Sequence, residues 1–130
     1  MRPGRILETC LYVDDLEGAE AFYSGLLGLE VHSRDAGRHL FLRCGENMLL
    51  LFRAEATERP HRSVPVHGAR GPGHIAFAVT APEIEAWRSK LEGAGVEIEK
   101  ELRWPGGGAS IYFRDPAGNS LEFATADLWD

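Results

Sequence analysis

The sequence has few cysteines, no excess of basic charge and no long hydrophobic run, and each shortage excludes a class of protein. Two cysteines, Cys10 and Cys44, are too few for a disulfide-rich secreted scaffold, and we expect both to be buried, reduced thiols in a cytoplasmic protein. The 14 Lys and Arg are outnumbered by 20 Asp and Glu, and a net charge of −6 argues against nucleic acid and anionic membranes as partners. No apolar run approaches the roughly 20 residues that span a bilayer, and no apolar segment typical of a signal peptide follows the N-terminus.

The length and composition indicate one soluble globular domain. Hydrophobic residues make up 44% and charged residues 26% of the 130, an ordinary balance for a chain that buries a core. Basic residues gather between Arg53 and Arg70, in a segment also rich in proline and glycine. We expect a solvated linker there, although its charge could also meet a carboxylate or phosphate on a small substrate. Its further basic members are Arg59, His61, Arg62 and His67.

Hydrophobic periodicity predicts the same order of elements twice. In the first half, a strand over 6–13 leads into a helix capped by an aspartate at 14 or 15 and ended by Gly28. In the second half, a strand over 74–79 leads into a helix that runs from about Pro82 to a glycine at 93 or 95. Further strands are predicted over 30–33, 39–44, 47–53, 96–102, 110–114 and 120–124. Each half therefore reads β-α-β-β-β, as module 1 (about 6–53) and module 2 (about 74–124), joined by a linker (about 54–73) within a single domain, 1–130.

The two halves also align residue by residue. The stretch 6–13 matches 73–80, which aligns Glu8 with His74, and the stretch 40–52 matches 111–124, which aligns Leu50 with Glu122. Three of these four positions carry a side chain that can bind a divalent cation, and the leucine cannot. Further matches pair Phe41 with Tyr112, Arg43 with Arg114, and Asn47 with Asn119.

Strand alternation predicts where these side chains point. One face of the first strand carries Glu8, Cys10 and Tyr12, and the equivalent face of its repeat carries His74. The opposite faces are apolar and should be covered by the helices, which present apolar stripes. A curved sheet with its helices outside would therefore gather the ionisable residues on a partly polar concave side.

Glu8, His74 and Glu122 together favour a metal site. A carboxylate on such a face is costly if it is desolvated and unpaired, and a shared cation removes that cost. Two carboxylates and an imidazole suit Zn, Mn, Ni, Co or Fe(II), and three protein ligands leave coordination positions open for substrate oxygens. Each residue alone has a structural explanation, as a strand histidine, a rim glutamate or a partner of an arginine. Their equivalent positions in a duplication favour the metal.

Several motifs make the chain resemble the vicinal oxygen chelate superfamily, which includes glyoxalase I, fosfomycin resistance enzymes, methylmalonyl-CoA epimerase, extradiol dioxygenases and bleomycin resistance proteins. The resemblance implies an α+β fold in which paired β-α-β-β-β modules form an open, barrel-like mixed sheet, usually in a homodimer. It also implies metal ligands from the first and last strands of the modules, which here are Glu8, His74 and Glu122. The motifs are VDDL (13–16), FY (22–23), LGL (27–29), GHIAF (73–77) and YFRDPAGNSLE (112–122).

Departures from the family patterns narrow the activity. Leu50 stands where enzymes similar to glyoxalase I and the epimerase carry a fourth ligand-type residue, which disfavours glyoxalase I activity. Extradiol dioxygenases hold Fe(II) with two histidines and one carboxylate. In this chain Glu8 occupies the position of the first histidine. Fosfomycin resistance enzymes share the three-ligand arrangement, usually with histidine first. Bleomycin-binding members lack the metal ligands.

We therefore expect a metal-dependent enzyme, a lyase, isomerase, transferase or dioxygenase, that chelates vicinal oxygens of a small metabolite or xenobiotic on a divalent metal. Strand alternation suggests hydrogen-bond donors near the substrate, and His39 could also serve as a base. The catalytic candidates are His39, Arg43 and Tyr112, and Tyr12 is a substrate-binding candidate.

Two other functions fit the same residues. A metal-free binding protein would sequester an aromatic drug or metabolite between Trp104, Phe41 and Phe52. Alternatively, the site has lost its catalytic activity, and its ligand residues persist in a scaffold or partner-binding role. The three glycines at 106–108 that follow Trp104 and Pro105 suggest either a mobile flap beside the site or a plain hairpin turn.

Overall fold

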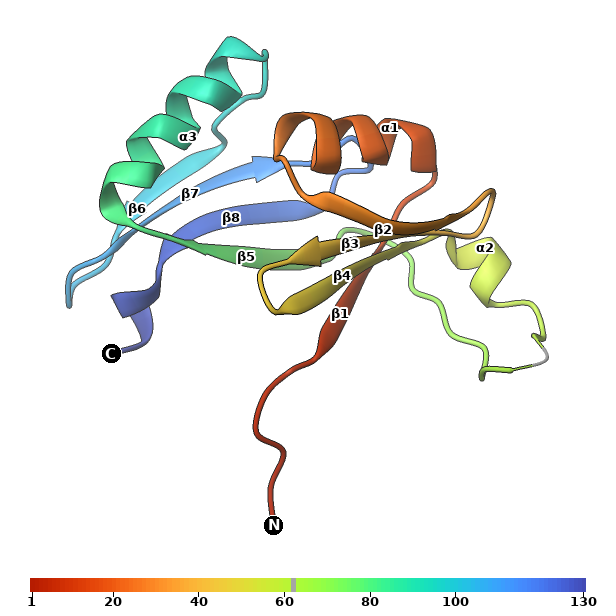
Figure 1. The fold of residues 1–130 in the computed structure, drawn as a ribbon. Coiled ribbons are helices and arrows are strands. Elements are labelled where there is room, and N and C mark those ends of the chain that lie inside the picture. Colours follow the sequence, from red (N-terminus) through yellow and green to blue (C-terminus); the bar gives the residue numbers. More distant parts are fainter. Residues whose placement is uncertain (62) are drawn as a thin grey trace. The chain divides into compact units, whose positions relative to one another are not determined.

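The computed structural model describes residues 1–61 and 63–130, and Figure 1 shows its ribbon coloured along the sequence. Arg62, part of the predicted basic segment, lies outside the described residues. The chain divides into two compact units, Met1–Gly71 and Pro72–Asp130, which correspond to the two predicted modules with the linker attached to the first. The single domain over 1–130 stays a prediction. Among the described residues, no helix is both long and apolar enough to cross a membrane.

The first unit is built on one open, four-stranded mixed sheet. Its elements are β1 (Glu8–Tyr12), α1 (Leu16–Glu20), the π-helix η1 (Ala21–Leu26), β2 (Glu30–Asp35), β3 (His39–Cys44), β4 (Asn47–Phe52) and α2 (Ala54–Thr57). The strand order is β1-β4-β3-β2, with β1 parallel to β4 and the other neighbours antiparallel. Helix α1 covers one face of this sheet (Figure 1).

The second unit repeats this topology. Its elements are β5 (His74–Val79), α3 (Ala81–Gly93), β6 (Lys100–Arg103), β7 (Ala109–Arg114), β8 (Ser120–Thr125) and the 3-10 helix η2 (Ala126–Trp129). The strand order is β5-β8-β7-β6, again with the first and last strands parallel. The predicted α+β class and the two β-α-β-β-β modules are confirmed, and each module forms its own four-stranded sheet.

The strand register confirms the internal duplication. In the first sheet Leu50 pairs with Phe41 on one side and with Cys10 on the other. In the second sheet Glu122 occupies the same place, between Tyr112 and Ala76. Leu50 and Glu122 are therefore structurally equivalent, as the alignment of the two halves predicts.

The core of the first unit lies on the face covered by α1. Alternate residues of β3 and β4 point to it, and Leu40, Leu42, Leu49 and Leu51 are all at most 1% exposed. Burying each such side chain stabilises the fold by roughly 1.5–3 kcal/mol. The intervening residues of the same strands necessarily face the other side of the sheet. This alternation leaves one sheet face free to carry polar and aromatic groups.

The first helix begins as the sequence predicts but changes pitch along its length. Asp15 caps it, because its Oδ1 accepts a hydrogen bond of 3.0 Å from the Gly18 backbone N–H. A Cβ at position 18 would lie 2.7 Å from the Asp15 carboxylate, so the cap favours glycine there. From Ala21 the turns widen into η1, and the Leu27 N–H bonds the Phe22 carbonyl at 2.9 Å.

The strand predicted over 96–102 is mostly wrong, since β6 begins at Lys100. The N–H of Val96 donates to the Leu91 carbonyl at 2.9 Å and that of Gly95 to the Glu92 carbonyl at 3.0 Å, which closes the end of α3. The first backbone N–H groups after the helix therefore bond the helix terminus, and the chain joins the sheet only at a later residue. Gly95, with φ of 78°, is the glycine that ends this helix.

The cysteine prediction is half right. Cys10 and Cys44 are free thiols, so neither belongs to a disulfide. Both are only partly buried, whereas burial was expected. Cys10 lies on the face of β1 that the helix leaves uncovered, whereas Cys44 shares the helix-covered face of β3 with Leu40 and Leu42 but is the last residue of that strand.

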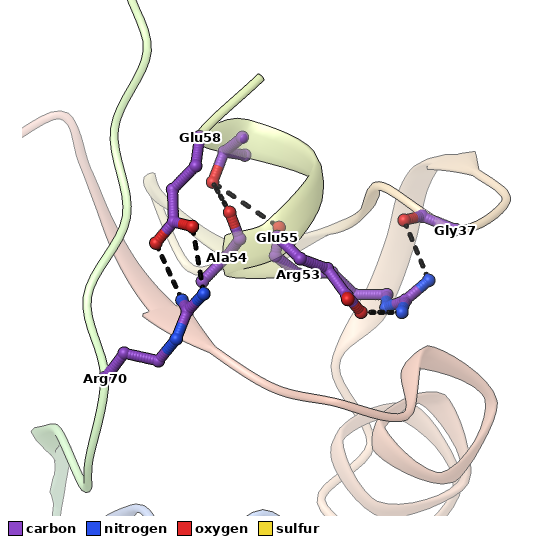
Figure 2. Close-up of polar contacts among 7 residues, drawn as sticks. Gly37, Arg53, Ala54, Glu55, Glu58 and Arg70 are labelled. Carbon is purple, nitrogen blue, oxygen red and sulfur yellow. Dashed lines mark hydrogen bonds and ion pairs between the residues drawn. The ribbon is translucent and has the colours of Figure 1, made fainter.

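The linker is more ordered than its composition suggests, since α2 occupies its start and its later part folds back on that helix. Figure 2 shows the two oxygens of Glu58 meeting the guanidinium of Arg70, with an ion pair of 2.7 Å. The His67 N–H also donates to the Thr57 carbonyl at 3.0 Å. Arg53, at the head of α2, pairs with Glu55 in the same view. These contacts attach the basic segment to the first unit.

The Asp15 cap gives a stability prediction. Asp15→Ala removes the acceptor for the Gly18 N–H, and we expect the free energy of unfolding to fall by about 1 kcal/mol in urea denaturation. Asp14→Ala removes the same charge from the exposed neighbouring position and should change it by less than half as much. Equal losses in the two variants would show that charge, and not the capping bond, is responsible.

Candidate functional site

Two of the predicted metal ligands lie side by side in the second unit. His74 begins β5 and Glu122 lies in the adjacent parallel strand β8, where the register pairs His74 with Ser120 and Ala76 with Glu122. Residues two apart share a sheet face, so both side chains point to the same side. His74 Nε2 lies 3.3 Å from Glu122 Oε1.

The His74 ring is held between two oxygen acceptors. Its Nδ1 lies 2.9 Å from the Ser120 carbonyl oxygen, while Nε2 faces the Glu122 carboxylate. A neutral imidazole has one N–H and one lone pair, so it can donate to only one of the two oxygens. The shorter contact favours the proton on Nδ1, which turns the Nε2 lone pair toward a negative oxygen. A metal cation or a second ring proton at Nε2 removes this repulsion.

Glu122 is fixed by a chain of hydrogen bonds from the glycine-rich loop. The residue is 5% exposed, and its Oε2 accepts a 2.5 Å bond from the Ser110 hydroxyl. The indole N–H of Trp104 donates in turn to Ser110 Oγ at 2.9 Å. This chain orders Oε2, and Oε1 remains directed at His74.

Tyr112 completes the polar group on this face. It is paired with Glu122 in the register of β7 and β8, and its ring stacks on His74 with centroids 6.4 Å apart. Burial first, and then the charge and hydrogen bonding of Glu122, raise the pKa of Tyr112 above its ordinary value. The phenol therefore stays neutral at physiological pH and keeps a proton to donate.

The donor set of His74 and Glu122 fits a divalent ion such as Zn, Mn, Ni, Co or Fe(II). The Ser120 carbonyl orients the ring as hydrogen-bond partners of metal-binding histidines commonly do. Within the described residues of either unit, no three histidine, cysteine, aspartate or glutamate side chains are grouped as a metal site. The third predicted ligand, Glu8, belongs to the first unit and is exposed at the start of β1.

The other predicted residues meet mostly in the first unit, around a cavity of about 640 Å³. The face of its sheet opposite α1 supplies the floor, as strand alternation predicts, and linker residues supply part of the wall. Leu50, the position without a ligand, is 8% exposed on this floor. Burial lowers the pKa of His39, so its ring is neutral at physiological pH. The predicted residues that line the cavity are Glu8, His39, Phe41, Arg43 and Phe52.

Trp104 does not line this cavity; it lies in the second unit, in the turn between β6 and β7. Its N–H donates to the Gly108 carbonyl at 3.1 Å, and the indole bonds Ser110, so the segment is a closed hairpin turn. Gly108 has φ of 82°, and a Cβ there would lie 2.7 Å from Thr125 Oγ1. Of the two options for this loop, the turn is the one observed.

Three contacting residues were missed by the sequence analysis. Ser110 shares the face of Tyr112 two residues away, and that alternation was the signal for it. Ser120 contributes a backbone carbonyl, for which side-chain identity carries no signal. His67 lies in the linker, and its ring Nδ1 is 2.5 Å from the Tyr12 hydroxyl. Only the folded linker brings these two together.

The Tyr12 phenol gives a prediction for alkaline pH. Desolvation, with added repulsion from Cys10 and Glu58, raises its pKa from 10.0 to about 12. The unfolded chain loses this proton at lower pH than the folded one, so stability should decline between pH 10 and 12. We expect a shallower decline for Tyr12→Phe in denaturation measured across that range. Identical slopes for the wild type and Tyr12→Phe would contradict the assignment.

Comparison with known proteins agrees with this fold. The family model described as the Glyoxalase/Bleomycin resistance protein/Dioxygenase superfamily matches residues 5–123. Glutathione transferase FosA of Serratia marcescens is 36% identical over 119 residues, which cover 91% of this chain and 78% of that protein. Metallothiol transferase FosB of Bacillus licheniformis is 38% identical over 58 residues, 44% of this chain and 38% of that protein. The crystal structure of lactoylglutathione lyase from Agrobacterium tumefaciens has a TM-score of 0.95 at 42% identity and covers 98% of both chains. The chain belongs to the glyoxalase/bleomycin resistance protein/dioxygenase superfamily.

Proposed function

We propose that this chain is a metal-dependent enzyme that acts on a small oxygenated metabolite or xenobiotic, with Glu8, His74 and Glu122 as metal ligands. The observation that carries the proposal is the His74 ring held between two oxygen acceptors, an arrangement that a cation at Nε2 relieves. The assignment of Glu8 as a metal ligand rests on the sequence, in which the duplication aligns it with His74. A homodimer, implied by the family resemblance, and a cytoplasmic location, expected from the two reduced cysteines, belong to the same proposal.

The surrounding residues have distinct tasks in this proposal. A bound divalent ion would supply Lewis acidity to two neighbouring substrate oxygens. Ser120 holds the His74 ring through Nδ1, and Ser110 holds Glu122 through Oε2. The neutral Tyr112 hydroxyl exchanges its hydrogen bond with Glu122 for one to a substrate oxygen that gains negative charge during the reaction. Arg43 and His39 of the first unit bind the substrate in this scheme.

The reaction class we favour is the transfer of a thiol compound onto an electrophilic substrate. The position equivalent to Glu122 is occupied by Leu50, so the site lacks a second carboxylate for proton abstraction there. An isomerisation of the glyoxalase I type needs such a base to take a proton from carbon. Addition of a thiol to an electrophile forms the S–C bond while the thiol proton passes to the substrate oxygen that gains negative charge, so no proton is taken from carbon. The names of a glutathione transferase, a metallothiol transferase and a lactoylglutathione lyase among similar proteins support a thiol compound as co-substrate.

The first-unit cavity favours a second candidate function, which is metal-free binding of an aromatic drug or metabolite. Phe41 and Phe52 both line it, with ring centroids 5.5 Å apart. Trp104, the third predicted ring, is engaged with Ser110 instead. Binding of this kind would persist unchanged in variants that lack His74 and Glu122.

Metal binding separates the two candidates. Tag-free protein stripped with a chelator, then dialysed against Zn, Mn, Ni or Fe(II), should retain about one ion per chain for at least one of these metals. His74→Ala and Glu122→Gln each remove a donor and should weaken retention by about tenfold or more. Glu92→Gln, an exposed glutamate on α3, should bind as the wild type does. Wild-type protein that retains none of the four metals would contradict the proposal of a metal-dependent enzyme.

A further inference from the structure

The uncovered face of the first unit's sheet forms a graded floor beneath the cavity of about 640 Å³. The register of β1, β4 and β3 arranges this floor in three rows across the strands. The first row is polar at both ends, the second is apolar, and the third is aromatic. These rows are, in order, Glu8-Met48-Arg43, Cys10-Leu50-Phe41 and Tyr12-Phe52-His39, and all of their members except Cys10 and Tyr12 line the cavity.

Flat rings dominate the second and third rows. His39 stacks on Phe41 with centroids 3.8 Å apart and planes inclined by 13°. Phe52 meets Phe41 edge-on at 5.5 Å, and the His67 ring from the linker meets Phe52 at 4.8 Å. Such a cluster offers both faces and edges to a further ring, which is the geometry in which aromatic pairs are stabilised. The neutral state of His39 keeps this part of the floor uncharged.

Arg43, at the end of the first row, is a cation without a carboxylate. Its Nη2 lies 3.2 Å from His32 Nδ1, and since guanidinium only donates, the imidazole nitrogen accepts. In the described chain, residues 1–61 and 63–130, no ion pair joins Arg43 to an acidic side chain, although Glu30 is its register partner on β2. Six other arginines do form ion pairs with glutamates, namely Arg5, Arg34, Arg53, Arg70, Arg88 and Arg114.

We propose that this cavity binds a small planar aromatic oxyanion, with its ring over the aromatic rows and its carboxylate or phosphonate on Arg43. His32 positions the guanidinium without neutralising it, so its remaining N–H groups are available for a two-pronged contact with an oxyanion. This inference rests on the second candidate function and deepens it by naming the ligand class and its anionic anchor; the binding residues all belong to the first unit and require no metal.

The acidic residues of the cavity set the direction of the ligand. Asp35 is paired with His39 in the register, at the aromatic end, and there it offsets the positive charge of Arg38, which lines the same end. Glu8 shares the row of Arg43 but lies two strands away, a separation of about 9–10 Å, and leaves the guanidinium unpaired. The anionic group is therefore directed to Arg43, at the β3 edge of the first row.

Arg38 provides a matched control for this anchor. It also lines the cavity and carries the same charge, but it follows Asp35 at the aromatic end, and its guanidinium donates to the Ala56 carbonyl at 3.2 Å. If the cavity attracted anions only through its summed charge, loss of either arginine would weaken binding alike. A direct contact makes Arg43 alone important.

Calorimetric titration of the chelator-treated protein with four probes tests the proposal. We expect 2-naphthoate or 2-naphthylphosphonate to bind at least about tenfold more tightly than 2-naphthylmethylamine, which has the opposite charge, and cyclohexanecarboxylate, which lacks the flat ring. The acid that binds more tightly shows whether the site prefers a carboxylate or a phosphonate. Equal affinity for the amine and the acids, or no binding of either acid at millimolar concentration, would overturn the proposal.

Variants then assign the contacts. Arg43→Gln should weaken binding of the preferred acid by about tenfold or more, and Arg38→Gln by less than about threefold. Both positions are at the surface of the cavity, and unchanged melting temperatures confirm that the variants fold. Equal effects of the two changes, or none for Arg43→Gln, would refute the anchor. A His74→Ala, Glu122→Gln double variant should bind the acid as the wild type does even if the metal proposal fails, and loss of binding there would contradict a site confined to the first unit.

Discussion

The arrangement on which the candidate site depends is one imidazole between two oxygen acceptors. The Ser120 carbonyl lies 2.9 Å from His74 Nδ1, and the Glu122 carboxylate lies 3.3 Å from Nε2. A neutral ring can donate to one oxygen and must turn its lone pair to the other, a conflict that costs free energy in a partly desolvated site. Glu122 has little freedom to move away, because Ser110 holds its second oxygen and the residue is 5% exposed. The sheet thus fixes a place for positive charge before any ion arrives.

The duplication explains why the two units offer different chemistry on the same framework. Both sheets have the same strand order, and Leu50 and Glu122 occupy the same place in it. With leucine, the first unit gains an apolar centre surrounded by Phe41 and Phe52, which favours a flat organic ligand. With glutamate, the second unit gains a buried carboxylate that accepts a hydrogen bond from Ser110 and faces His74. One substitution between repeats therefore separates a binding surface from a candidate metal centre.

Much of this was predictable from the sequence, for identifiable reasons. Strand alternation correctly placed His39, Phe41 and Arg43 on one face, because a period of two is set by backbone geometry alone. The pairing of Leu50 with Glu122 followed from the repeat. The contacts of Ser120 and His67 could not be predicted, since one is made by a backbone carbonyl and the other depends on how the linker folds back through Glu58 and Arg70. The late start of β6 was missed because Val96 is apolar, yet its N–H is taken by the end of α3.

The most direct test of the account is the state of the two His74 ring nitrogens when zinc is present. A long-range 1H–15N correlation spectrum of the histidine rings distinguishes a protonated nitrogen, a bare nitrogen and a metal-bound nitrogen. The account predicts that one equivalent of zinc shifts the His74 Nε2 resonance to the metal-bound range while Nδ1 keeps its proton toward Ser120. A His74 signal unchanged by zinc, or a proton found on Nε2 in the zinc-treated protein, would contradict it.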